Sequence, residues 1–268
     1  MHSHGEVGAL IRLWREARGL SQLALSLDVG ISSRHLSFVE NARSRPSADL
    51  LMALATRLEV PLRERNELLL AGGFAPRYRE TPIDAPALAM VRTSIDRLLA
   101  AHDPYPGVAL DRCWNVMIAN QAAQRLVELL PAALRTLPFN TFRTGLHPDG
   151  LRRLTSNFDQ WGAYLLGQLD RLVMRTLDPG ASALLDEVTA WPGIRELRQQ
   201  VTPASANEPQ LLVPVIIDLN GHRLSMFTTL ATLGSPLDVT LSELTLELFY
   251  PADEDTAQTL RNTSGAAR

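Results

Sequence analysis

Hydrophobic residues recur at three- and four-residue spacing in five successive segments of the first 75 positions. This spacing is typical of amphipathic helices. Gly19, Gly30, Pro61 and the pair Gly72-Gly73 interrupt the pattern where helices would end or begin. The pattern therefore predicts helices over 6–18, after Ser21, after Ser32, from Ser47 to Leu58, and from Pro61. The apolar positions behind this prediction are Val7, Leu10, Ile11, Trp14, Leu23, Ala24, Leu27, Leu36, Val39, Leu50, Leu51, Leu54, Ala55 and Leu58.

The stretch from Ser21 to Arg45 combines two of these helices with a tight turn. Ser21 and Ser32 are good N-cap residues, and Gly30 between the helices can take a left-handed conformation without steric cost. Two short helices joined in this way predict a helix-turn-helix. A helical hairpin with no nucleic-acid role is the alternative.

The rest of the chain mixes helical and strand patterns. Helices are predicted over 86–102, 121–130, 181–190, 193–200 and 254–261, and a long apolar stripe recurs at helical spacing from Leu151 to Leu172. Strands are predicted over 108–110, 114–119, 211–219, 223–232 and 239–250, with an Asn220-Gly221 hairpin turn. We expect an all-α N-terminal domain and an α+β C-terminal domain whose sheet is antiparallel. A strand pair that leads directly into a short helix resembles the start of a PAS domain.

Composition excludes several kinds of chemistry. The 268 residues include 26 basic ones, and all are Arg. Without Lys the chain cannot form a Walker P-loop or a pyridoxal phosphate Schiff base. One cysteine, Cys113, and six scattered histidines do not match a zinc or cupin metal site. We expect neither a cofactor nor a metal, and no enzymatic activity.

Charge is unevenly distributed along the chain. Residues 1–80 hold 11 Arg and 9 acidic residues, whereas 81–268 hold 15 Arg and 20 acidic residues. The N-terminal part, at about +2, is therefore better suited to a polyanion than the C-terminal part, at about −5. The absence of an apolar run of membrane-spanning length or a signal-peptide pattern predicts a cytoplasmic protein with no membrane partner.

The second helix of the helix-turn-helix carries polar residues on its first turn, as a recognition helix does. Arg34 is expected to prefer guanine, a contact worth about 1–3 kcal/mol of discrimination. Phe38 is assigned either to the core or to a thymine methyl. The base-edge candidates are Ser33, Arg34 and Ser37, and the candidates for contacts with the DNA backbone are Gln22, Ser32, Asn41, Arg43 and Arg45.

These residues resemble the XRE family of helix-turn-helix regulators. The matching segments are Arg18-Gly19-Leu20-Ser21-Gln22, Val29-Gly30, Val39-Glu40-Asn41-Ala42-Arg43 and Pro46-Ser47. Ala42 departs from the family, which usually has Gly after the Asn in order to accept a left-handed conformation. Because Asn takes positive φ more cheaply than Ala, we expect the turn to shift by one residue to Asn41.

The C-terminal part resembles the MmyB-like regulators, in which an XRE domain precedes a PAS-like ligand-binding domain. The resemblance is carried by Asn140-Thr141-Phe142-Arg143, by 146–152, by 157–161, and by 235–241 through 249–253. It implies a bacterial transcription regulator that binds a fatty acid or a similar apolar molecule. The expected boundaries are 1–75 for the DNA-binding domain, 76–86 for a linker, 87–262 for the ligand-binding domain and 263–268 for a tail.

An apolar pocket is lined by the same residue types as a core, so individual assignments are open to both readings. Arg143 and His147 lie in a polar segment between apolar runs, and either could hold a carboxylate head group or serve as a surface or structural residue. The ligand-binding candidates are Trp114, Phe142, Arg143, His147, Phe158, Trp161, Met174, Met226 and Phe227.

The patterns predict a homodimeric, sequence-specific regulator of double-stranded DNA, and the resemblance to the MmyB-like regulators implies that a small apolar ligand changes its operator affinity. The alternative is a ligand-carrying or partner-binding protein that uses the helix-turn-helix as an interaction module.

Overall fold

The structure is a computed structural model that describes residues 4–135, 138–200, 212–219, 221–234 and 236–265. The chain divides into two compact units. The first comprises residues up to Thr81 with the short segments Met174–Thr176 and Pro236–Ser242, and the second comprises the remainder.

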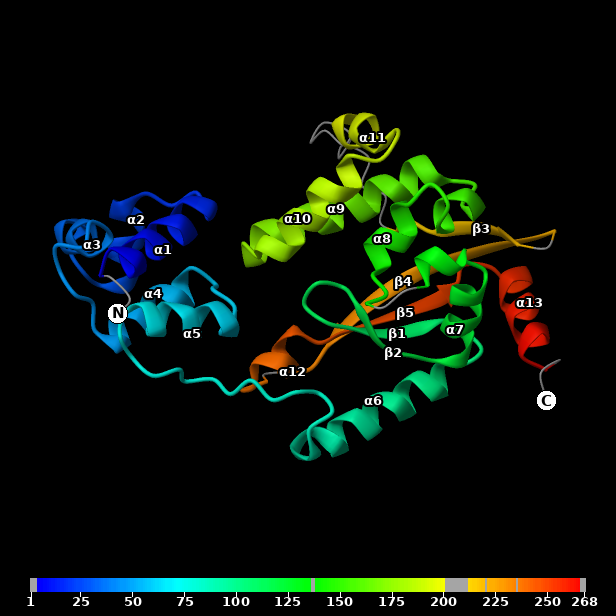
Figure 1. The fold of residues 1–268 in the computed structure, drawn as a ribbon, viewed down its shortest axis with the longest axis horizontal. Helices are drawn as coiled ribbons and strands as arrows, with labels where there is room; N and C mark the ends of the chain where they lie inside the picture. Colours follow the sequence, from blue (N-terminus) through cyan, green and yellow to red (C-terminus); the bar gives the residue numbers. More distant parts are fainter. Residues whose placement is uncertain (1–3, 136–137, 201–211, 220, 235, 266–268) are drawn as a thin grey trace. The chain divides into compact units, whose positions relative to one another are not determined.

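Five helices form the N-terminal domain: α1 (His4–Ala17), α2 (Gln22–Val29), α3 (Ser33–Glu40), α4 (Ala48–Arg57) and α5 (Leu62–Ala71). Figure 1 shows them in blue to cyan as a bundle of short helices. Their buried faces meet at residues such as Ile11, Leu36 and Leu54, each no more than 1% exposed. Gly8 allows α1 to approach the end of α3, because a Cβ at this position would lie 2.5 Å from the Val39 carbonyl oxygen. The predicted all-α helix-turn-helix domain is confirmed.

The caps of the helix-turn-helix follow the sequence prediction. The Ser21 hydroxyl accepts a hydrogen bond from Ala24 N, and the Ser32 hydroxyl accepts one from His35 N. Gly30 ends α2 in the left-handed conformation, with φ of 75°.

The predicted inner face of α2 was wrong. Leu23 and Leu27 are 59% and 70% exposed, whereas Leu25 and Ser26 are buried. The helix is only two turns long, so periodicity alone could not fix which side packs inward.

The turn after α3 also differs from the prediction. Ala42 itself takes the left-handed conformation, with φ of 58°, whereas Asn41 has φ of −96°. The Asn41 side chain donates through Nδ2 to the carbonyl oxygen of Ser37 and accepts from Arg12 Nη2. Asn41 therefore remains a capping residue, and the turn does not shift.

The C-terminal domain is built on one antiparallel sheet in the order β2-β1-β5-β4-β3. Its strands are β1 (Gly107–Leu110), β2 (Val116–Ala119), β3 (Val215–Leu219), β4 (His222–Thr232) and β5 (Thr245–Pro251). The hairpin register pairs Leu219 with His222, and Gly221 has φ of 81°; Asn220 and Leu211 of the predicted hairpin strands lie outside the described residues. This confirms the predicted α+β PAS-like domain with an antiparallel sheet.

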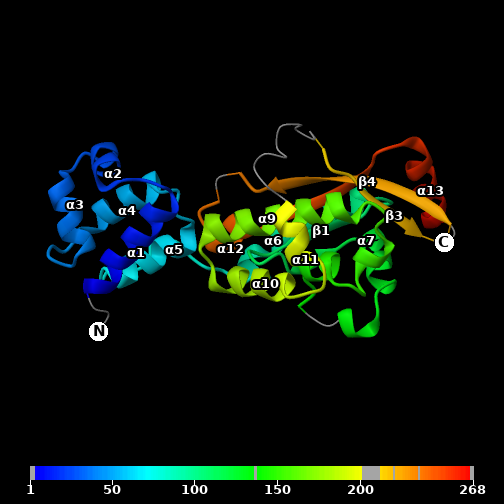
Figure 2. The ribbon, with the colours of Figure 1, turned by 90° about the horizontal axis from the view of Figure 1, so that it is seen from above.

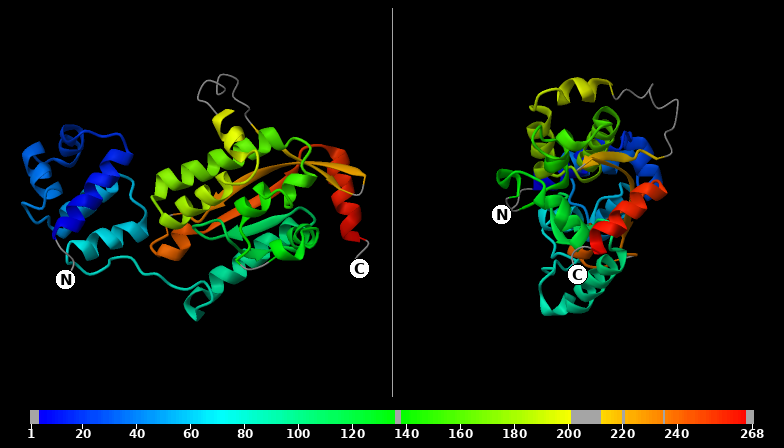
Figure 3. Two further views of the ribbon diagram at one scale, coloured as in Figure 1. Left: turned by 45° about the horizontal axis from the view of Figure 1, so that its top comes forward. Right: turned by 90° about the vertical axis from the view of Figure 1, so that its right-hand side faces the viewer.

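Helices lie on both faces of the sheet, as Figures 1 and 3 show. One face meets α6 (Ala89–His102), which follows the short 3-10 turn η1 (Pro86–Leu88) and packs Ile95 and Leu99 against the sheet. The other face meets α7 (Gln121–Glu128), α8 (Thr141–Leu146) and α9 (Phe158–Thr176). Figure 2 shows α9 beside α10 (Pro179–Thr189), which adds to the same core. Completing the domain are η2 (Ala132–Leu134), η3 (Leu151–Leu154), α11 (Ile194–Gln200) and α13 (Glu254–Gly265). The short helix α12 (Val239–Glu243) lies almost wholly in the segment that belongs to the first compact unit.

Two of the predicted elements are divided differently. The strand predicted over 239–250 is a short helix, α12, followed by β5, because Asp238 begins a helical turn in which its carboxylate accepts from Leu241 N. The stripe from Leu151 to Leu172 is divided between η3 and α9. The Asn157 side chain between them is bonded to the start of β3, where it accepts from Ile216 N and donates to the Pro214 carbonyl oxygen.

The left-handed backbone at Ala42 predicts that Ala42→Gly stabilises the protein. Relief of about 1–2 kcal/mol of left-handed strain exceeds the extra unfolded-state entropy of Gly, so we expect a gain of about 1 kcal/mol in the free energy of unfolding. Urea denaturation followed by circular dichroism measures it. Ala53→Gly, at an exposed position inside α4, is the matched control and should lose about 1 kcal/mol. A loss of stability in both variants would contradict the prediction.

Candidate DNA-binding surface and ligand cavity

The N-terminal turn of α3 forms an exposed polar surface. Ser32, Ser33, Arg34 and His35 are all exposed, while Leu36 and Val39 on the same helix are fully buried. A helix anchored by one face in this way presents the opposite face, beginning with its N-terminal turn, to solvent. This is the arrangement that a recognition helix needs in a major groove.

Glu40 at the end of α3 connects three helices through a buried carboxylate. Its Oε1 accepts from Arg15 Nε at 2.7 Å, and its Oε2 accepts from Arg15 Nη2 at 3.0 Å and from Gln22 Nε2 at 2.8 Å. Arg12 Nε lies 3.5 Å from the same Oε2. Burial acts to raise the pKa of Glu40, but the hydrogen bonds from Arg15 and Gln22 outweigh it and hold the pKa below its usual value. The buried carboxylate is therefore ionised and fixes α3 to α1 and α2.

Several of the predicted DNA contacts also have partners within the domain. Gln22 donates to Glu40, and the Arg45 guanidinium donates to the Gly72 carbonyl oxygen and lies over the Phe74 ring. Arg34 lies over the ring of half-buried Phe38, with its Cζ 5.3 Å from the ring centroid. Ser37 is half-buried and accepts from Asn41, and Arg43 is exposed in the loop that follows.

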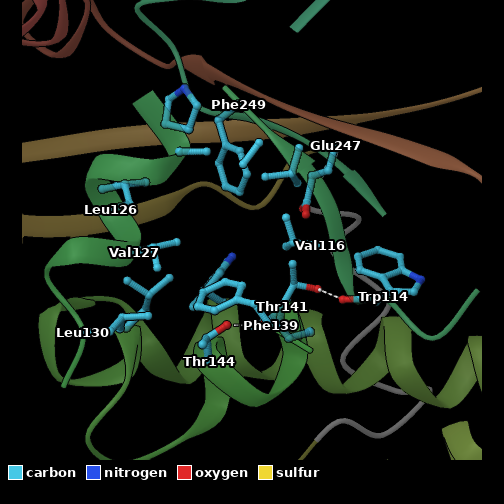
Figure 4. A pocket seen from close by; sticks show the side chains of 17 residues that line it. Trp114, Val116, Leu126, Val127, Leu130, Phe139, Thr141, Thr144, Glu247 and Phe249 are labelled. Atoms are coloured by element: carbon cyan, nitrogen blue, oxygen red, sulfur yellow. Dashed lines mark hydrogen bonds between the residues drawn. The ribbon is translucent and has the colours of Figure 1, made fainter. Parts of the chain in front are cut away.

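A cavity of about 90 Å³ lies between the sheet and helices α7, α8 and α9. Figure 4 shows side chains converging on it from both the strands and the helices. Its lining is almost wholly apolar. The lining residues are Pro106, Val108, Trp114, Val116, Ala119, Ala123, Leu126, Val127, Leu130, Phe139, Thr141, Thr144, Leu151, Trp161, Leu165, Glu247 and Phe249.

Glu247 is the ionisable residue of this lining. It lies on the central strand β5, paired with Val108 on β1 and Leu230 on β4, and is 6% exposed. Figure 4 shows its carboxyl directed toward the cavity. Among the described residues, none donates a hydrogen bond to it or forms an ion pair with it, and burial raises its pKa to about 7.

Sequence reasoning missed Glu247. A strand pattern of Thr-Leu-Glu-Leu-Phe suggests that Glu faces water, because apolar residues flank it on both sides. Only the covering of both sheet faces reveals that this side chain is buried.

Two of the predicted ligand residues line the cavity, Trp114 and Trp161. Trp114 has φ of 63°, and its carbonyl oxygen accepts from Thr141 N. Phe142 stacks behind it at a centroid distance of 4.6 Å and is fully buried, so it supports the wall rather than forming it.

The predicted head-group residues lie outside this cavity. Arg143 forms a two-pronged ion pair with Glu187, at 2.7 Å from Nε to Oε1 and 2.6 Å from Nη2 to Oε2. His147 contacts the edge of Trp191 and accepts from Asp149 N through Nδ1. The geometry of both residues therefore fits the alternative interpretation, in which each serves as a surface or structural residue.

The remaining predicted ligand residues also lie elsewhere. The Phe158 ring lies under the Arg152 guanidinium, Met174 is 62% exposed at the end of α9, and Phe227 stacks on Tyr250. Met226 lines a second cavity of about 210 Å³. The sequence pattern indicated that these residues are apolar, but it could not determine which of them line the same cavity.

The second cavity shares Pro106 and Leu126 with the first. Its lining is more polar and includes Arg125 and His222, with Thr259 from α13. The two cavities are therefore neighbours that share these two lining residues.

The two domains define a transcription regulator with a DNA-binding and a ligand-binding part. Residues 91–262 match the family model of the MmyB-like transcription regulator ligand binding domain, and residues 11–65 match a helix-turn-helix model. The chain therefore belongs to the MmyB-like transcription regulators, with an XRE-type helix-turn-helix at its N-terminal end.

Other comparisons give less. No curated protein matches the chain significantly. A solved structure of an RNA-binding light-oxygen-voltage receptor aligns at 14% identity and a TM-score of 0.24, over 98% of this chain. The chain spans 64% of the length of that protein. None of the helices in the described residues is long and apolar enough to cross a membrane, and those residues contain no group of three metal-binding side chains.

The buried Glu40 interaction predicts a large effect of Arg15→Ala. Removal of the guanidinium leaves a buried carboxylate without its main partner, which costs roughly 3–5 kcal/mol of the free energy of unfolding. Arg57→Ala is the control, because Arg57 pairs with Asp28 at the surface and should cost less than about 1 kcal/mol. Chemical denaturation of the full chain compares them, and equal costs would contradict the structural role given to Glu40.

Glu247 predicts that stability falls as pH rises. Its pKa is about 7 in the folded protein against 4.5 as a free side chain, so the folded state holds the proton more tightly. Ionisation of Glu247 therefore lowers the free energy of unfolding. This loss is absent below pH 4.5, grows between pH 4.5 and 7, and is complete above pH 7. Glu247→Gln should therefore raise the free energy of unfolding by on the order of 3 kcal/mol at pH 8 and change it little at pH 4.

Denaturation curves at the two pH values measure this difference. Glu128→Gln, at an exposed position on α7, is the control and should behave as the wild type at both. A Glu247→Gln variant that keeps the wild-type dependence on pH would show that Glu247 is not the group responsible.

Proposed function

We propose that this protein is a cytoplasmic, homodimeric regulator that binds specific double-stranded DNA operators and changes its operator affinity when an apolar ligand occupies the C-terminal domain. The observation that carries the proposal is the exposed N-terminal turn of α3, which the buried Glu40 interaction fixes to α1 and α2. A rigid polar turn of this kind is suited to reading base edges.

Within this proposal, Ser33, Arg34 and Ser37 contact bases, and Ser32, Asn41 and Arg43 contact phosphates. Gln22 and Arg45 reach phosphates only by sharing or leaving their present partners, Glu40 and the Gly72 carbonyl oxygen. The N-terminal charge of about +2 gives weak nonspecific attraction, so two recognition helices acting together are needed for tight binding.

The ligand that best suits the cavity is apolar, a fatty acid or a similar molecule. Apolar side chains form nearly all of the lining, which supports an apolar ligand. The cavity of about 90 Å³ is small beside ligand pockets of roughly 300–1,000 Å³. A long chain would therefore enter only with a shift of Pro106 or Leu126 toward the neighbouring cavity. A ligand that favours this expanded conformer shifts the population toward it, which is the physical basis of regulation by linkage.

Arg34 supplies the test of DNA recognition. Selection of duplex sites from a random library should yield operators with guanine at one position of each half-site. Arg34→Ala should lose this preference, at a cost of about 1–3 kcal/mol for the guanine operator and little for others. Arg57→Ala, on the surface of α4, is the control and should retain the preference. An unchanged selection in Arg34→Ala would contradict the assignment of Arg34.

Salt dependence distinguishes the regulator from a protein whose helix-turn-helix serves as an interaction module. A specific operator affinity whose logarithm falls linearly with the logarithm of the salt concentration supports the regulator. Sedimentation of the protein with and without operator tests the dimer. A protein that stays monomeric in both states, or that binds duplex DNA without sequence preference, would refute the proposed function.

A further inference from the structure

The threonine hydroxyls and the ionised Glu247 carboxylate of the first cavity share one property: in the described lining they offer it hydrogen-bond acceptors, whereas the indole N–H groups of Trp114 and Trp161 are donors. Thr144 Oγ1 donates to the Asn140 carbonyl oxygen at 2.6 Å, and Thr141 Oγ1 donates to the Trp114 carbonyl oxygen at 3.3 Å. Each threonine hydroxyl has only one hydrogen to donate, so only lone pairs remain for a ligand. Figure 4 shows both threonines on the helix side of the cavity and Glu247 on the strand side.

Glu247 adds a buried carboxyl to this set of acceptors. Among the residues that the structure describes, no Arg or His lines the first cavity, whereas Arg125 and His222 both line the second. A ligand carboxylate in the first cavity would therefore meet another carboxyl and no compensating cation. Like charges at short distance in an apolar site strongly oppose ionisation of both groups.

We propose that the first cavity selects an apolar ligand that carries a hydrogen-bond donor, a hydroxyl or an amino group, and that the Glu247 carboxyl binds this donor. The inference rests on the proposed function and narrows its ligand class. A fatty acid that enters this cavity does so with its chain, or with a hydroxyl on that chain, and its ionised head group stays outside. Glu247 is thus the residue that determines polarity and orientation of the ligand.

A chain-matched set of small probes tests the selection. Hexan-1-ol, hexylamine and hexanoate share an alkyl chain and differ in the head group. Trp114 and Trp161 line the cavity, so their fluorescence reports occupancy in the full-length protein at pH 8, where Glu247 is mostly ionised. A hydrogen bond to a charged group is worth about 1.5–3 kcal/mol, so hexan-1-ol and hexylamine should bind at least roughly tenfold more tightly than hexanoate.

Two variants of Glu247 separate its chemistry from its volume. In Glu247→Gln the amide offers donors as well as an acceptor, so the preference over hexanoate should fall by roughly tenfold. Glu247→Leu should bind the alkyl chains with no preference between hydroxyl and carboxylate beyond their own solvation. Glu128→Gln should keep the wild-type ratio. Circular dichroism checks that each variant is folded.

Three results would overturn the inference: equal binding of hexanoate and hexan-1-ol by the wild type, an unchanged ratio in Glu247→Gln, or no binding of any probe. The last result would show that the cavity does not admit ligands of this size. Operator binding is measured on the same preparations without probe. Loss of donor selectivity with intact operator binding would reject this inference alone, whereas absent operator binding would reject the proposed function.

Discussion

The ionised carboxylate of Glu40 is the constraint on which the DNA-binding half depends. An unpaired carboxylate in this position would be strongly destabilising, so its stability requires Arg15 and Gln22 to reach it from α1 and α2. The consequence is geometric: α3 cannot tilt without breaking hydrogen bonds to two other helices. The exposed turn that begins with Ser32 and Ser33 is therefore held rigidly although it makes few contacts itself.

The parts of the fold that local chemistry specifies could be predicted from the sequence. Ser21, Ser32 and Asn120 each accept a hydrogen bond at a helix start, because a cap needs only the next three residues. The strands of the sheet and the hairpin at Gly221 follow from short patterns as well, except at 239–243, where the predicted strand begins as helix α12. The inner face of α2 could not be predicted, since Leu25 and Ser26 are buried by packing against distant helices.

The ligand site was harder to predict for the same physical reason. Arg143 is occupied by Glu187, which lies 44 positions further along the chain. The error at Glu247 is the reverse: its strand pattern suggests an exposed residue, but its side chain is buried because helices cover both faces of the sheet. A pocket is defined by which apolar residues fail to fill the space between them, and no local pattern encodes this. Trp114 and Trp161 were identified only because large aromatic residues are common in both cores and pockets.

The two cavities share two lining residues, Leu126 and Pro106, and therefore lie next to each other in the C-terminal domain. Leu126 belongs to the short helix α7, and Pro106 lies just before the first strand, so the shared residues come from two different segments of the domain. The first cavity contains the carboxyl of Glu247, whereas the second contains the side chains of Arg125 and His222. A molecule long enough to occupy both cavities would contact acceptors at one end and Arg125 and His222 at the other. Both its length and the identity of its end groups would therefore determine how well it binds.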